Sequence, residues 1–117
     1  AVVAYATRIK AQVLGVDAAH LERTGPVDRD VALQMADGVR RLLGADVGLA
    51  TTGVAGPGPA DGHPAGTVHV AVVAPWGQRH RELHLGGDRS QIRCATVMEV
   101  CELAIGFLQK DECGPQP

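Results

Sequence analysis

Aromatic side chains are scarce in this chain of 117 residues: they make up 3% of it, and Tyr5, Trp76 and Phe107 are the entire supply. A core must therefore be aliphatic, and the 45% hydrophobic content is enough to build one in a single domain. The net charge is only −2, without a run of Lys or Arg, so we expect no nucleic-acid partner. No apolar run is long enough to cross a bilayer, so we expect no membrane partner either.

Cysteines are also few, and their spacing argues against a disulfide framework. Cys94 and Cys101 lie seven residues apart in an expected helix, which separates their Cα atoms by about 10 Å. That distance is too long for a disulfide bond, and Cys113 lies in a tail rich in Gly and Pro. Reduced thiols predict a cytoplasmic protein. The chain opens on AVVAYATRIK, an apolar run without an initial Met, so we expect a fragment of a longer protein.

The hydrophobic pattern predicts one layered α/β/α domain over residues 1–117. Capping signals mark two of its helices: Asp28 before one, and Asp88 with Gln91 as a capping box before another. We expect a mixed, partly parallel sheet that includes an antiparallel hairpin. The predicted elements are a buried strand at 1–5, helices at 7–15 and 29–43, strands at 46–52, 67–75 and 78–85, and a helix at 89–109, with a helical turn around 18–21 and a C-cap at Gly44.

Residues 51–70, TTGVAGPGPADGHPAGTVHV, place three glycines directly after an expected strand. A dinucleotide-binding fingerprint requires G-x-G-x-x-G before a helix, whereas this loop has the order G-x-x-G-x-G and precedes a strand. A P-loop requires Gly-Lys-Ser/Thr, which is absent. Both nucleotide motifs are therefore excluded. Spacing alone favours a structural turn and a ligand cradle equally.

Three segments together resemble the CinA C-terminal domain family, whose members include nicotinamide-nucleotide amidases. These segments are VVAYATRIKAQVLGV, GLATTGVAGPGPADGHPAGTVHVAV and GDRSQIR. The most specific pattern is a strand, a (T/S)G(V/I)AGP loop and a P-x-GTV strand, and the likeness covers nearly the whole chain. The resemblance implies hydrolysis of the amide of nicotinamide mononucleotide, which gives nicotinic acid mononucleotide and ammonia, without a cofactor.

The family's chemistry resembles a Ser–Lys–Tyr amidase arrangement. Its Y-x-x-x-x-K segment matches Tyr5 and Lys10, which the resemblance makes the catalytic pair. Taken alone, an interfacial tyrosine and a solvated lysine would be the commoner interpretation. We expect Lys10 to lie in the first turn of a helix, where the macrodipole lowers its pKa. The family's nucleophile lies in an upstream A-E-S-C-T-G-G-type segment that this chain lacks, and Ser90, the chain's one serine, matches no nucleophile position.

The resemblance also implies that the glycine loop contacts the nucleotide through backbone N–H groups. Arg89 and Arg93 could reach a phosphate, although the start of a surface helix commonly carries such charges. His63 lies in the loop, where a solvated histidine is the simpler interpretation. The predicted substrate-binding residues are Thr52, Gly53, Ala55, Gly56, Gly66 and Thr67.

His80, Glu82 and His84 would share one face of a strand, which is compatible with a metal site. Solvated strand faces often carry such residues and the family's chemistry requires no metal, so we predict no metal site here. A different class of function stays open: a non-catalytic remnant of a competence- or damage-inducible protein that binds a nucleotide or another subunit. The oligomeric state is open too, although family members commonly self-associate.

Overall fold

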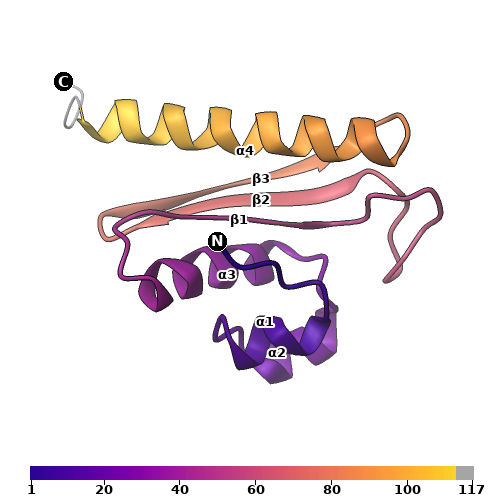
Figure 1. Ribbon diagram of the computed structural model, residues 1–117, viewed down its shortest axis with the longest axis horizontal. Coiled ribbons are helices and arrows are strands. Elements are labelled where there is room, and N and C mark those ends of the chain that lie inside the picture. The colour runs from indigo at the N-terminus through magenta and orange to yellow at the C-terminus, as the bar shows by residue number, and fades with distance from the viewer. Residues whose placement is uncertain (113–117) are drawn as a thin grey trace.

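The structure of the protein is a computed structural model that describes residues 1–112, with side chains up to residue 109. It forms three layers: a sheet in the middle, the long helix α4 over one face, and the other three helices beyond the opposite face (Figure 1). The predicted α/β/α layering is confirmed. The elements are α1 (Thr7–Gln12), α2 (Ala18–Thr24), α3 (Arg29–Leu42), β1 (Gly48–Gly53), β2 (Thr67–Ala74), β3 (Gly77–His84) and α4 (Arg89–Glu112).

The sheet of the described residues has the order β1-β2-β3 and is antiparallel throughout, so the predicted parallel part is wrong. That prediction depended on a strand at residues 1–5. In the structure this segment is not a strand, and its residues alternate between exposed and half-buried. The three observed strands follow one another without a crossover helix, and such connections produce antiparallel neighbours.

The two faces of β2 bury different clusters, because successive side chains point to opposite sides of a sheet. Ala71 and Val73 pack with residues of α3, whereas Val68, Val70 and Val72 pack with residues of α4. Both clusters are aliphatic apart from Phe107, as the scarcity of aromatic residues requires.

Local signals place the helix ends. Asp28 accepts hydrogen bonds from the backbone N–H groups of Asp30 and Val31, and so caps α3. Asp88 and Gln91 exchange backbone-to-side-chain bonds of 2.8 and 2.9 Å, which confirms the capping box. The predicted turn at 18–21 is longer than expected, because Asp17 caps a complete helix, α2. Gly44 follows the C-cap residue of α3, Leu43, and has a φ of +64°.

Cys94 and Cys101 are free, as their spacing predicts, and both are exposed; Cys113 lies outside the described residues. Over residues 1–112, no helix combines the length and the apolar character that a membrane crossing requires.

Candidate active site

A cleft of about 1010 Å³ opens between the N-terminal segment, β1 and the glycine loop. Its volume is that of a large small-molecule site. The charged side chains among its described lining residues are Lys10, Asp61, Arg89 and Arg93. The cleft also brings together Tyr5, Thr52, Gly53, Ala55 and Gly56 from the predicted site, whereas Gly66, Thr67 and His63 are not among its lining residues.

Lys10 is the most unusual residue of the cleft, because it is a lysine with only 7% of its surface exposed. Its Nζ donates a hydrogen bond of 2.6 Å to the backbone oxygen of Ala4. Burial lowers the pKa of Lys10, and the negative charge of Asp61 raises it in part. A lysine in this environment loses its proton more readily than one in water, as a general base must.

The expected cause of the lowered pKa is wrong. Helix α1 ends at Gln12, so Lys10 lies in its last turn rather than its first. The negative end of the macrodipole is the nearer one there, and it would raise the pKa of a lysine. Burial is the physical cause instead.

Tyr5 lines the cleft and is 91% exposed. A phenol so open to water is available to a ligand that enters the cleft. Its place in a catalytic pair with Lys10, which the resemblance implies, stays a prediction.

The glycine loop is tied to helix α4. Arg89 donates a hydrogen bond of 2.8 Å to the backbone oxygen of Gly56, which has a φ of +89°. This φ suits glycine, because side chains disfavour the left-handed region. A Cβ on Gly53 would lie 2.6 Å from the backbone oxygen of Thr67, so Gly53 is required by the close approach of two strands. The loop thus combines close strand packing at Gly53 with a left-handed backbone conformation at Gly56.

Gly66 and Thr67, two of the predicted substrate contacts, lie outside the lining of the cleft and pack against other parts of the chain. A Cβ on Gly66 would lie only 1.9 Å from the backbone oxygen of Leu85. Thr67 is buried in β2. Thr52 lines the cleft, but its hydroxyl donates to the backbone oxygen of Pro26 at 2.6 Å, which joins β1 to the turn before α3.

The histidines form a second polar group, on the α3 side of the sheet. His69 is buried in β2, and its Nδ1 lies 2.8 Å from Nε2 of His80. Burial lowers the pKa of both imidazoles, so the pair favours its neutral form. Sequence reasoning missed His69, because it sits in an otherwise apolar strand. The register of β2 and β3 sets His69 opposite Glu82. It thereby places His69 beside His80, Glu82 and His84, which the sequence had placed on one face of a strand.

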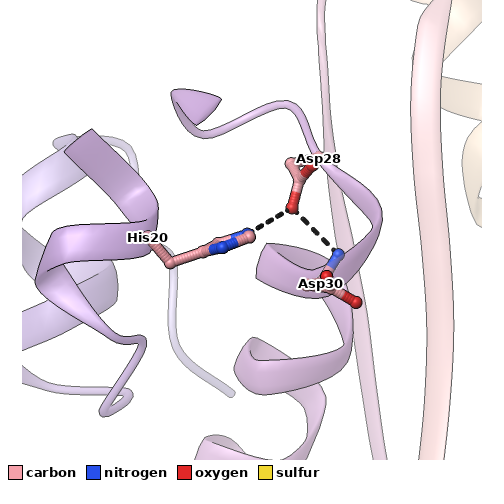
Figure 2. Close-up of side chains that lie close together, drawn as sticks. All are labelled: His20, Asp28 and Asp30. Carbon is pink, nitrogen blue, oxygen red and sulfur yellow. Dashed lines mark hydrogen bonds and ion pairs between the residues drawn. The ribbon is translucent and has the colours of Figure 1, made fainter. Parts of the chain in front are cut away.

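A third polar group lies at the start of α3 (Figure 2). His20 Nε2 is 2.8 Å from Asp28 Oδ2, the oxygen that caps the helix. Burial raises the pKa of Asp28, but hydrogen bonds from His20 and from the backbone lower it further, so that the net pKa lies below its usual value. Ligand atoms of His20, Asp28 and Asp30 lie within 4.8 Å of one another. His20 belongs to another helix, α2, and no sequence motif predicts its pairing with Asp28.

Comparison with known proteins agrees with this fold. A family model described as the CinA C-terminal domain matches residues 1–108. A protein of Desulforamulus reducens that is named for competence-damage induction is 46% identical over 108 residues, which cover 92% of this chain and 26% of that protein. A CinA-like protein of Frankia casuarinae is 47% identical over 102 residues, which cover 87% of this chain and 24% of that protein.

Solved structures show the same likeness. The crystal structure of the competence/damage inducible protein CihA from Agrobacterium tumefaciens matches with a TM-score of 0.82 at 39% identity, over 87% of this chain and 64% of that one. The chain spans about a quarter of the length of the two curated relatives. Because the family model covers nearly all of its sequence, this chain belongs to the CinA C-terminal domain family.

Proposed function

We propose that this chain supplies the base and the substrate cleft of an amidase that hydrolyses nicotinamide mononucleotide to nicotinic acid mononucleotide and ammonia. The observation that carries the proposal is Lys10: a buried lysine with a lowered pKa, in the same cleft as the glycine loop. The resemblance of the Y-x-x-x-x-K and TGVAGP segments to nicotinamide-nucleotide amidases supports the substrate. The nucleophilic serine would come from an A-E-S-C-T-G-G-type segment. A protein that carries this segment before residues 1–117 is the extended chain.

The proposed reaction is an acyl transfer to serine. The serine oxygen attacks the carboxamide carbon while its proton moves to the neutral Nζ of Lys10. That proton then passes to the departing nitrogen, which leaves as ammonia, and water hydrolyses the resulting ester to release the acid and the serine. Backbone N–H groups of Ala55 and Gly56, which line the cleft, are the proposed donors to the negative oxygen of the intermediate.

The charges of the cleft suit a nucleotide. Arg93 is the proposed contact of the phosphate, because it lines the cleft near the start of α4. Arg89 lies close by but already holds the backbone of Gly56, so its first role is to position the loop. Asp61, a residue of the glycine loop, moderates the pKa of Lys10.

The alternative is a binding module without catalysis, and one observation favours it. Among the described lining residues there is neither a serine nor a cysteine, and Ser90 is exposed at the start of α4 outside the lining. As it stands, residues 1–117 would bind the nucleotide rather than convert it.

The test is a calorimetric titration of residues 1–117 with nicotinamide mononucleotide and with nicotinamide riboside, which lacks the phosphate. We expect the nucleotide to bind, and Arg93→Gln to weaken its binding at least about tenfold, the effect of one charge-assisted hydrogen bond. Binding of the riboside should not change in this variant. Arg79→Gln, which removes an exposed cation on β3 outside the cleft, is the control. No binding of the nucleotide, or equal losses for both ligands, would overturn the proposed cleft.

A further inference from the structure

The cleft contains one carboxylate. Asp61 is the only acidic residue among the described residues that line it, where the other charged side chains are Lys10, Arg89 and Arg93. Asp61 is exposed, and its carboxylate makes no hydrogen bond or ion pair with any described residue. An ionised carboxylate only accepts hydrogen bonds and carries a negative charge, so this one is available to a positive group of a ligand.

The backbone fixes the place of this carboxylate. Residues 60–63 form a two-residue hairpin turn, whose outer backbone groups exchange hydrogen bonds of 3.0 and 2.9 Å. Asp61 and Gly62, its central residues, have φ of +52° and +79°. Turns of type I′ have positive φ at both positions, and Asp tolerates this conformation better than most residues. The turn therefore holds Asp61 in the cleft, where its charge acts on Lys10.

We propose that Asp61 determines specificity for a cationic ring, by placing its carboxylate against the pyridinium of nicotinamide mononucleotide. This role of Asp61 rests on the proposed function, which names that nucleotide as the substrate. The pyridinium ring carries a positive charge that the reduced, dihydropyridine form lacks. A negative charge beside the ring would therefore favour the oxidised nucleotide over the reduced one.

The proposed reaction itself brings the ring toward Asp61. The carboxamide that the serine attacks is bonded directly to the pyridinium ring, so the ring must lie close to the base. Lys10 is the base in that mechanism, and the charge of Asp61 acts on it. The ring and the carboxylate would thus occupy the same part of the cleft, while Arg93 is the proposed contact of the phosphate.

A bound pyridinium would also help the base. The negative charge of Asp61 raises the pKa of Lys10, which opposes the loss of its proton. A positive ring beside Asp61 offsets that charge and repels the protonated amine. Lys10 would therefore release its proton more readily when the oxidised nucleotide is bound.

The experiment is a calorimetric titration of residues 1–117 with nicotinamide mononucleotide and with its reduced form, for the unaltered chain and for Asp61→Asn. The two ligands share the phosphate, the ribose and the carboxamide, and differ in the charge of the ring. Asparagine tolerates a positive φ as aspartate does, so the variant keeps the turn and loses the charge. Asp46→Asn, at an exposed acidic residue outside the lining of the cleft, is the matched control.

We expect Asp61→Asn to weaken binding of the oxidised nucleotide about fivefold, the upper effect of an ion pair that stays partly open to water. Binding of the reduced nucleotide should not weaken, and Asp46→Asn should change neither affinity. Equal losses for both ligands, or an unchanged affinity for the oxidised one, would overturn the role of Asp61. If Arg93→Gln still weakened binding of the nucleotide, the proposed function would stand without it. Binding of neither ligand would overturn both.

Discussion

Replacing Lys10 by methionine should lower ammonia release from nicotinamide mononucleotide by the extended chain about a thousandfold. The loss follows from the proposed role, because a positioned general base contributes on the order of 10²–10⁴ in rate. Methionine is an unbranched apolar side chain of nearly the same length as lysine, and it lacks the amine. The measurement is kcat for ammonia release, with the bound fraction of nucleotide determined separately.

The same change should not destabilise the fold. Burial lowers the pKa of Lys10, so the folded chain binds fewer protons at this residue than the unfolded chain does. The ionised lysine therefore costs stability at every pH below its unfolded pKa, and methionine removes that cost. Arg8→Met is the matched control, since Arg8 is an exposed cation on the same helix, and its turnover should be nearly unchanged. Full activity in the Lys10 variant would show that the base lies elsewhere.

Replacing Gly66 by alanine should lower the free energy of unfolding by about 3 kcal/mol or more. Its φ is +94°, and a Cβ would lie 1.9 Å from the backbone oxygen of Leu85. That contact cannot be relieved by a side-chain rotation, so the ends of β2 and β3 must separate. The backbone bonds that Gly66 makes to Val54 and Leu85 would weaken as well.

Substitutions at two other glycines serve as controls, because they distinguish the cost of a positive φ from the cost of a steric clash. Gly62 has a φ of +79°, and a Cβ added there would meet nothing within 4 Å, so Gly62→Ala should cost only about 1 kcal/mol. Gly58 has open space and no positive φ, so Gly58→Ala should be nearly neutral. The measurement is urea denaturation of the three variants. An equal loss of unfolding free energy in all three variants would contradict a structural role for Gly66. The prediction that Gly66 contacts the substrate would then stand.

Local signals were sufficient for much of the fold. The caps at Asp28 and Asp88, and the alternation of strands on both sides of the Trp76 turn, determined helix starts and a hairpin because each depends on neighbours in the chain. The strand predicted at residues 1–5 failed for the opposite reason. A strand exists only when another strand pairs with it, and none of the described strands reaches this segment.

The candidate site shows the same difference between features that depend on neighbours in the chain and features that depend on distant residues. The sequence identified Lys10 through its motif, but its burial arises from tertiary packing that no local pattern records. Gly66 resembled a ligand contact in the sequence, whereas the fold sets the backbone of Leu85 against it. His69 became visible only through the register of β2 and β3. Interactions between distant residues are what the sequence could not supply.

The most direct test of the central claim compares ammonia release from nicotinamide mononucleotide by the extended chain and by residues 1–117 alone. Acyl transfer needs nucleophile, base and oxyanion donors together, and such units lose nearly all activity when one member is absent. We predict that the extended chain releases one ammonia for each nicotinic acid mononucleotide formed, and that residues 1–117 bind the nucleotide without turnover. An extended chain that binds the nucleotide but releases no ammonia would contradict the amidase and leave the binding module as the function.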